Sequence, residues 1–379
     1  MIHKYLFEQD IPQYAVESFE SIEDPRITCV NNGTVLPAKI DRNKVWGLGG
    51  VLDENDLFVE ESRLDENFGG KYSYDKEKTI ICRENILFLG VFPNHWGHFL
   101  IDVLCKLWCI DSISEDVKIA YVGVDWIDSK EISKVFVDAL ELVGINRERL
   151  MYIDEPTFFD KILIPDRTLG FKHSWHSKYK IVIEKMIQNA CAIERQKGTQ
   201  SYEKIYFTRT RFAAARKKEV GEKIIADFFE RNGYEIISPE LLSVTEQIFL
   251  FNSCREFACV SGTLAHNSLF AQKDAQLTIF NRTNEANPPQ LRIDQLTRLT
   301  ITYVDAFSSR ELKKRTGYNA RDNRIVHVLE INENVKNYAK DNNMRLPTEN
   351  CIVKLQNNIT WSVLSFRQFL ATWKHKIFG

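Results

Sequence analysis

The chain has 379 residues, which is enough for two domains of ordinary size. Its 44% hydrophobic and 27% charged residues are typical of a globular protein and exclude a fibrous or disordered chain. The formal net charge of −2 gives no global reason to bind nucleic acid, so any cationic site must be local.

The N-terminal half reads as strands and turns up to about residue 90. From Asn94 the pattern changes, because apolar residues recur at helical spacing in "HWGHFLIDVLCKLWCI". Strand-like and helix-like runs then alternate through "KIAYVGV", "SKEISKVFVDALELVGI", "RLMYID" and "FDKILIP". This alternation predicts an α/β domain with a mostly parallel sheet over residues 1–200.

A long predicted helix, "YKIVIEKMIQNACAIERQKG", leads into a polar stretch, where we place an interdomain linker near residues 195–203. A second domain of alternating strands and helices is expected over residues 201–310. The tail, residues 311–379, closes with a helix-like run that we expect to pack back on the N-terminal domain.

The apolar runs and the cysteines of the sequence both indicate where in the cell the protein is located. The first residues lack the apolar core of a signal peptide, and no stretch approaches the roughly eighteen apolar residues that span a bilayer. The eight cysteines are scattered without Cys-x-x-Cys pairs, as in a reduced protein, so we expect a cytoplasmic location. The run 360–378 mixes aromatic, basic and apolar residues, and a peripheral contact with the plasma membrane is the alternative to packing within the fold.

The segment "NHWGHFLID", from Asn94 to Asp102, holds the strongest candidates for proton chemistry. In a helix that starts near Trp96, His98 and Asp102 are four residues apart and lie on one face, and either can act as a general base. Two alternatives stay open. His95, His98 and Asp102 can bind a metal ion, or His98 and Asp102 serve only to hydrogen-bond each other at the helix start.

A cationic cluster follows the predicted strand "KIYFT" and contains Arg209, Arg211 and Arg216. Arginine binds phosphate oxygens bidentately and stays charged at any working pH, so we expect a diphosphate contact here, first of all from Arg209. The chain has no Asp-x-Asp motif, and these arginines would stabilise a leaving diphosphate in place of a divalent ion. A solvated basic turn is the alternative.

A turn of small residues, Ser261, Gly262 and Thr263, follows the later strand "FACV". Glycine allows close approach of an anion to the backbone N–H groups. His266 and Asn267 come next; His266 either contacts the ligand or is a buried, hydrogen-bonded histidine. Two successive turns of this kind, one cationic and one bare, fit a nucleotide or sugar nucleotide at the carboxyl edge of a parallel sheet.

Three stretches carry a resemblance to glycosyltransferase family 61. "NHWGHFLID" resembles its N-terminal motif and "GGVLDENDLFVEES" its lead-in segment, while "YFTRTR…RKKE…GYEIISPELLSVTEQIFLFNSC…SGTLAHNSLF" resembles its C-terminal half. The resemblance runs from about Val45 to Phe280. It departs from the family where Ser-Gly-Thr replaces a His-Gly-Ala turn and where Lys218-Glu219 replaces an Asn-Glu pair.

The resemblance implies a GT-B architecture, with two Rossmann-like domains facing a cleft, and an inverting transfer of a sugar from a nucleotide donor to a glycan hydroxyl. It favours Asp102 as the base with His98 orienting it, and the reverse assignment is the alternative. Asn94, His95 and Trp96 would then contact the acceptor. The implied setting is bacterial surface polysaccharide biosynthesis, such as capsule or lipopolysaccharide.

By analogy with GT-B enzymes, Glu240 would hold the donor ribose, ahead of a helix that Ser243 and Glu246 open with a capping-box pattern. The expected partners are a nucleotide sugar and an oligosaccharide or lipid-linked glycan, without nucleic acid and without a metal or other cofactor. Two other functions stay open: a metal-dependent hydrolase that uses His95, His98 and Asp102, and a non-catalytic protein that binds sugar nucleotides.

Overall fold

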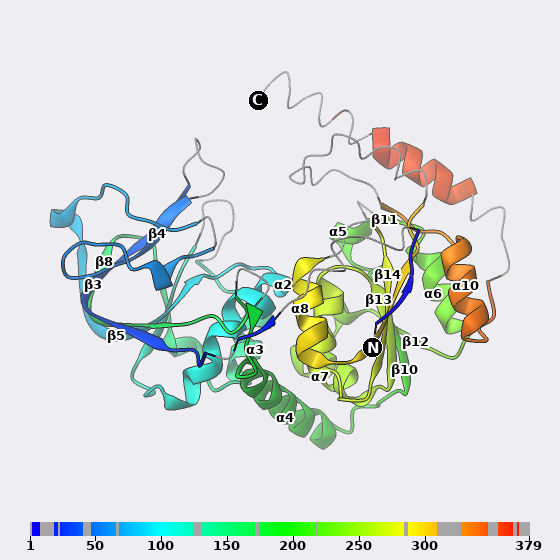
Figure 1. The fold of residues 1–379 in the computed structure, drawn as a ribbon, viewed down its shortest axis with the longest axis horizontal. Helices are drawn as coiled ribbons and strands as arrows, with labels where there is room; N and C mark the ends of the chain where they lie inside the picture. Colours follow the sequence, from blue (N-terminus) through cyan, green and yellow to red (C-terminus); the bar gives the residue numbers. More distant parts are fainter. Residues whose placement is uncertain are drawn as a thin grey trace. The chain divides into compact units, whose positions relative to one another are not determined.

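The computed structural model (Figure 1) describes residues 2–7, 19–21, 23–40, 47–65, 68–123, 130–170, 174–216, 219–283, 287–308, 327–347, 355–366 and 370. Contacts divide the chain into two compact units, each built on a six-stranded sheet. The N-terminal unit comprises Glu17–Ile193, and the C-terminal unit comprises Met1–Val16 together with Glu194–Gly379. The predicted mixture of helices and sheets is therefore present in both halves.

The sheet of the N-terminal unit is mixed, with strand order β4-β3-β8-β5-β6-β7. Strands β5 to β8 pair in parallel, whereas β3 pairs antiparallel with both β4 and β8. The strands are β3 (Ile27–Ile40), β4 (Gly47–Leu52), β5 (Ile80–Val91), β6 (Lys118–Val122), β7 (Leu150–Ile153) and β8 (Thr157–Pro165). The predicted parallel sheet is correct for the strands that alternate with helices, and the turn-rich start of the chain adds an antiparallel edge.

Other elements of this unit are α3 (Lys134–Glu141), α4 (Tyr179–Lys197), the short helices η1 (Glu60–Ser62), η2 (Lys76–Lys78) and η5 (Arg147–Arg149), and the paired strands β2 (Phe19–Glu20) and β9 (Ser174–Trp175). The helical segment over residues 96–112 is described with the candidate site. The second half of β5 is buried on both faces of the sheet. Its sequence, "ILFLG", is accordingly apolar at every position rather than alternating. The chain leaves this strand directly into the "NHWGHFLID" segment, which places that segment at the carboxyl edge of the parallel strands.

The sheet of the C-terminal unit is parallel throughout, with strand order β12-β10-β13-β14-β15-β1. Its strands are β10 (Lys204–Phe207), β12 (Glu235–Ile237), β13 (Glu256–Val260), β14 (Gln276–Asn281), β15 (Thr300–Asp305) and β1 (Ile2–Tyr5). Its other elements are α5 (Ala213–Arg216), α6 (Glu222–Glu230), η6 (Pro239–Leu241), α7 (Val244–Ser253), η7 (Thr263–Phe270), α8 (Pro288–Thr297), α10 (Glu333–Asp341), the paired strands β11 (Glu219–Val220) and β16 (His327–Val328), and a helix over residues 355–366.

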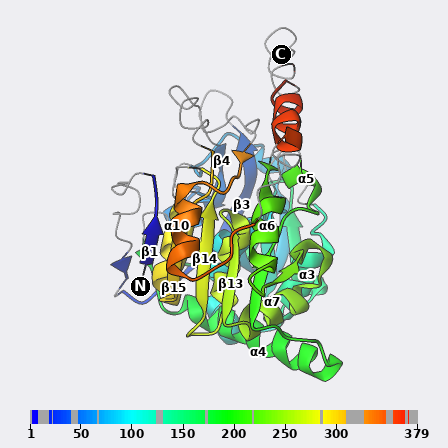
Figure 2. The same cartoon turned by 90° about the vertical axis from the view of Figure 1, so that its right-hand side faces the viewer.

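The strand order reverses direction beside β10. The chain first steps outward from β10 to the edge strand β12 and then returns to β13 on the other side of β10. Helices α6 and α10 cover one face of the sheet and α7 and α8 the other (Figures 1 and 2). The carboxyl ends of β10 and β13 therefore border the crevice at which open parallel sheets bind ligands.

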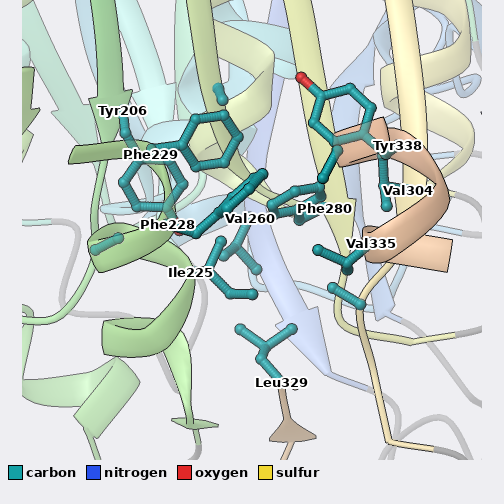
Figure 3. Close-up of a cluster of buried hydrophobic side chains, with 14 of the residues drawn as sticks. Tyr206, Ile225, Phe228, Phe229, Val260, Phe280, Val304, Leu329, Val335 and Tyr338 are labelled. Atoms are coloured by element: carbon teal, nitrogen blue, oxygen red, sulfur yellow. The ribbon is translucent and has the colours of Figure 1, made fainter. Parts of the chain in front are cut away.

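The α6 and α10 face is packed with aromatic side chains, shown in Figure 3. Phe228 and Phe229 of α6 pack beside Phe280 of β14, and Tyr338 of α10 meets Phe280 edge to face with ring centroids 5.8 Å apart. Burial of this kind contributes about 1.5–3 kcal/mol for each large apolar side chain. This packing fixes the sheet whose carboxyl edge carries the candidate residues.

The domain boundaries differ from the prediction in two ways. The first strand, β1, pairs with β15 and so belongs to the C-terminal unit, where a short edge strand completes the parallel sheet. The boundary falls at residue 194, inside α4, because the end of that helix holds Glu194, which accepts a hydrogen bond from Thr245 at the start of α7. Within the predicted tail, α10 belongs to the core of the C-terminal unit. The helix-like run that closes the tail lies largely outside the described residues, and its packing stays a prediction.

Candidate active site

The "NHWGHFLID" segment does not continue as one regular helix. It begins as a short α-helix, α2 (Trp96–His98), changes to the π-helix η3 (Phe99–Val103) and ends as the 3-10 helix η4 (Leu104–Ser112). Buried Phe99, Leu100 and Val103 anchor one side, as the apolar spacing predicts. Short π-helical turns are rare and often occur at functional sites. Asp102 lies within this turn.

His98, Asp102 and Arg167 form a hydrogen-bonded chain in the N-terminal unit. Nδ1 of His98 lies 2.8 Å from Oδ2 of Asp102, and Nη2 of Arg167 donates to Oδ1 of Asp102 at 2.6 Å. Arg167 also donates to the backbone carbonyls of Ile101 and Leu169, which holds its guanidinium in place. Both oxygens of Asp102 are thus engaged, while 57% of the His98 side chain is exposed.

The protonation states follow from this geometry. Burial alone would raise the pKa of Asp102, but the hydrogen bond from His98 and the charge of Arg167 outweigh it and lower that pKa to about 2. An ionised carboxylate only accepts hydrogen bonds, so Nδ1 of His98 carries the proton and donates it. The same hydrogen bond raises the pKa of His98 above its ordinary value. In neutral His98 the lone pair is therefore on the exposed ring's Nε2.

Of the residues predicted to contact the acceptor, His95 lies against this histidine. The rings of His95 and His98 meet edge to face, with centroids 5.1 Å apart. Trp96 stacks on Phe99, so part of its role is packing, and the side-chain amide of Asn94 donates to the carbonyl of Glu131. Within the described ranges, no group of three or more His, Cys, Asp and Glu side chains is placed to hold a metal ion.

In the C-terminal unit, two arginines share one buried carboxylate. Nη1 of Arg209, which follows β10, donates to Oε1 of Glu219 at 2.9 Å, and Nη1 of Arg282, which follows β14, donates to the same oxygen. The Glu219 side chain is only 3% exposed. The single charge of Glu219 thus compensates only one of the two guanidinium charges. Each guanidinium has five N–H donors, of which the carboxylate uses one.

Gly262 lies beside both guanidinium groups. Its φ of +129° is a conformation that residues with a Cβ rarely adopt. A Cβ at this position would lie 3.0 Å from Nη2 of Arg282 and 3.8 Å from Nη1 of Arg209. Thr263 then begins η7. The first backbone N–H groups of a helix have no acceptor within the helix, so they can bind an anion. The two predicted turns therefore do meet, and the cationic and bare surfaces are adjacent.

A second carboxylate, that of Glu222, holds the backbone beside this cluster. Glu222, the first residue of α6, accepts from the backbone N–H of Arg209 at 2.6 Å and from the hydroxyl of Thr208 at 3.1 Å. Burial raises its pKa to about 7, partly opposed by the Arg209 N–H and assisted by the charge of Glu219. Gly221, with a φ of +92°, precedes it because a Cβ there would meet the carbonyl oxygen of Leu329. The loop that carries Arg209 is therefore fixed at its backbone.

His266 and Asn267 are buried in η7. Nδ1 of His266 lies 2.8 Å from Oε1 of Gln290 in α8, and Gln290 in turn donates to Asp294. His266 is therefore a buried, hydrogen-bonded histidine, which was one of the two alternatives expected for it. The turns of η7 direct its side chain towards α8. Ser261 stays at the crevice, where its hydroxyl accepts from the backbone N–H of Arg282 at 3.2 Å.

A pocket of about 470 Å³ lies beside β12 and α7. Its walls combine apolar and polar side chains, including those of Ile236, Ile237, Leu242, Tyr202, Thr210 and Arg211. Thr208 and Thr210, which flank Arg209 in sequence, both line it, so the pocket adjoins the cationic cluster. Glu240 is exposed on η6 and is not among the lining residues, whereas the predicted capping box of Ser243 and Glu246 is present.

Comparison with protein families gives one match. Residues 96–278 match the model of the family Glycosyltransferase 61. The matched segment starts at the first residue of α2 and ends inside β14, so it includes His98, Asp102, Arg209 and Gly262, and it is slightly less than half of the chain. It supports the predicted family and a glycosyltransferase activity. No curated protein matches the chain significantly.

Sequence reasoning did not name Arg167, Glu219 or Arg282 as members of the two side-chain clusters. The first and last each follow a parallel strand, at "IPDR" and "IFNR", so the rule that selected Arg209 would also have selected them. Glu219 lies in a two-residue strand, and its only signal was the resemblance, in which Lys218-Glu219 stands at the position of an Asn-Glu pair. Arg216 lies in α5, whose final side chain is outside the described part, as are Lys217 and Lys218.

Proposed function

We propose that this protein is an inverting glycosyltransferase that moves a sugar from a nucleotide-sugar donor to a glycan hydroxyl in surface polysaccharide biosynthesis. One observation carries the donor assignment: two guanidinium groups and a bare glycine turn meet at the point where the strand order of a parallel sheet reverses. The match to Glycosyltransferase 61 supports the reaction class. The capsule or lipopolysaccharide setting comes from the resemblance alone.

The donor diphosphate would bind against Gly262, with Arg209 and Arg282 on either side. Guanidinium groups bind phosphate oxygens in pairs, and backbone N–H groups at the start of η7 add further donors. The adjoining pocket beside β12 is large enough for a base and ribose, and its mixture of apolar walls and hydroxyl groups suits a nucleoside. The positive charge of the cluster would stabilise the leaving diphosphate, and we expect the reaction to proceed without a divalent ion.

We assign the base to His98 rather than Asp102. A general base needs an accessible lone pair, which the exposed ring of His98 offers at Nε2, whereas Asp102 has a low pKa and two occupied oxygens. Nε2 of His98 would take the proton from the acceptor hydroxyl as its oxygen attacks the anomeric carbon. The bond between that carbon and the diphosphate oxygen breaks, and the nucleoside diphosphate leaves with the electron pair. Attack from the opposite side inverts the configuration.

In this proposal the N-terminal unit binds the acceptor near His95 and Trp96, and the C-terminal unit binds the donor, as in a GT-B enzyme. A panel of nucleotide sugars tested by thermal shift would identify the donor, since a ligand at a hundred times its Kd adds roughly 2.7 kcal/mol of stability. Slow hydrolysis or transfer from that donor should disappear in His98→Ala while donor binding persists. A protein that is stabilised by no nucleotide sugar or nucleoside diphosphate would contradict the proposed function.

A further inference from the structure

Lys106 of η4 is a buried cation that the proposed mechanism does not use. It is only 2% exposed and lies four residues after Asp102 in the same helical segment. Its Nζ donates to the backbone carbonyl of Leu89, near the end of β5, at 2.8 Å. Among the described residues its hydrogen-bond acceptor is thus an uncharged carbonyl. Lysine is almost never buried to this extent without an ionic partner, so its presence here calls for a physical reason.

The backbone around Leu89 has room for this ammonium group. The pairing of β5 with β6 shifts register between Phe88 and Val91, as at a β-bulge. Gly90 lies within this irregularity and has a φ of +82°, and a Cβ there would lie 3.1 Å from Nζ of Lys106. Glycine suits the position for two reasons, because it adopts the left-handed conformation and leaves space for the ammonium group.

The contact between Lys106 and Leu89 closes the segment that carries the proposed base. The chain leaves β5, passes through His98 and Asp102 and reaches Lys106, whose side chain bonds back to the strand. Carbonyls of the irregular helix are held by three more side chains: Tyr179 donates to Leu100, Arg167 to Ile101 and Thr168 to Cys105. A π-helical turn departs from regular helical bonding, so these contacts fix its position against the strand.

The charge of Lys106 is not needed for this contact. A neutral donor satisfies a carbonyl, and burial of an ammonium group costs free energy that an apolar side chain of similar length does not cost. Burial and the charge of Arg167 lower the pKa of Lys106 to about 8, whereas Cys105 and Asp102 act in the opposite direction. Lys106 therefore carries its charge at neutral pH, and that charge interacts with the carboxylate of Asp102.

We propose that Lys106 is a positioning residue for the base. It ties the turn that carries Asp102 to the end of β5, and its charge adds to that of Arg167 in compensating the carboxylate. This inference rests on the proposed role of His98 as the base. It assigns a use to the buried charge, because an apolar residue at position 106 would neither hold the turn nor act on Asp102.

Loss of this cation has a definite effect on His98. The pKa of His98 responds to a few neighbours, which a substitution at Lys106 leaves in place: Asp102 through a hydrogen bond and its charge, the charges of Asp65 and Arg167, and the adjacent ring of His95. Without the Lys106 cation, less of the Asp102 charge is compensated. Protonated His98 is then favoured, and its pKa rises.

The Lys106→Met variant of the full chain tests this proposal, since methionine has a similar length without charge or donor. The His98 signal, assigned by its loss in His98→Ala, is titrated by NMR without substrates. Its pKa should rise by about half a unit or more in Lys106→Met and stay near the wild-type value in Lys106→Arg, which keeps the charge. With the nucleotide sugar that stabilises the protein, kcat of Lys106→Met should fall about 10- to 100-fold. The Kd for the nucleoside diphosphate should not change.

Lys118→Met is the matched control. Nζ of Lys118 also donates to a backbone carbonyl, that of Glu148, but at the amino end of β6. This variant should keep the wild-type pKa of His98 and the wild-type kcat. The titration needs no nucleotide sugar, so it can succeed or fail separately from the proposed function.

Three outcomes would overturn the proposal. The pKa of His98 could be unchanged in Lys106→Met, or Lys118→Met could shift it equally. Alternatively, kcat of Lys106→Met could fall together with donor affinity and melting temperature, which would mean that Lys106 serves the fold alone. If Lys106→Met does not fold, Lys106→Arg decides the question: a wild-type pKa of His98 with most of kcat retained supports the proposal, and a shifted pKa contradicts it.

Discussion

Substitution of Arg282 by alanine tests the donor site at a residue that only the structure revealed. The variant removes one of the two guanidinium groups beside Gly262 and leaves Arg209 bonded to Glu219 at 2.9 Å, so the buried carboxylate keeps a cationic partner. A hydrogen bond to a charged group contributes about 1.5–3 kcal/mol. The Kd for a nucleoside diphosphate should therefore rise by roughly 10- to 150-fold, because each 1.4 kcal/mol is a factor of ten.

Isothermal titration calorimetry with the nucleoside diphosphate that stabilises the wild type most would measure this change, and inorganic pyrophosphate would show whether the loss lies in the diphosphate contact. Arg255→Ala is the matched control, since Arg255 is exposed at the opposite, amino end of β13. Its affinity should equal that of the wild type. An Arg282→Ala protein that is folded and binds both ligands normally would refute the diphosphate site.

Three further predictions concern pH and backbone geometry. The rate of transfer should rise with pH through the raised pKa of His98, because His98 must be neutral to act as a base. Asp102→Asn should move the midpoint of the pH–rate profile to lower pH. An unmoved midpoint would show that Asp102 does not raise the pKa of the catalytic base. The pKa of Glu222 is about 7 in the folded protein and 4.5 in the unfolded chain. Its contribution to the free energy of unfolding is therefore fully favourable below pH 4.5 and is lost as the pH rises through 7. Glu222→Gln should therefore add up to about 3 kcal/mol at neutral pH in urea unfolding, and equal stability would show that Glu222 is not desolvated. Gly262→Ala should cost about 1–3 kcal/mol of strain and weaken diphosphate binding, because its Cβ would press on Arg282; unchanged binding would argue against close backbone approach.

The strands and their order illustrate what sequence reasoning can and cannot reach. Alternating strand and helix patterns were enough to predict parallel strands in both halves, and the residues after β10 and β13 were correctly expected to meet at one edge. The pairing of β1 with β15 could not be predicted, because a four-residue strand pairs across almost three hundred residues and no local pattern encodes its partner. The partner of such a strand is decided by which edge of the assembled sheet is left to pair, and the local sequence does not show this.

The side-chain roles show a similar division. Spacing alone predicted that His98 and Asp102 share a face, and they are hydrogen-bonded. Which of the two is the better base depends on Arg167, which lies 65 residues further along the chain and donates a hydrogen bond to the second carboxylate oxygen of Asp102. In the same way, the position of Glu219 between two arginines is set by tertiary structure, and the turns of η7 bury His266 although its sequence position suggested a ligand contact. Local motifs therefore identified the loops, and packing decides which side chains face the crevice.

A crystal structure with the bound nucleoside diphosphate tests the central claim most directly. Its diphosphate oxygens should lie within hydrogen-bonding distance of the Arg209 and Arg282 guanidinium groups, beside the backbone of Gly262, with the nucleoside in the pocket lined by Thr208 and Thr210. A complex in which the nucleotide binds elsewhere, while both arginines keep only Glu219 as a partner, would contradict the account.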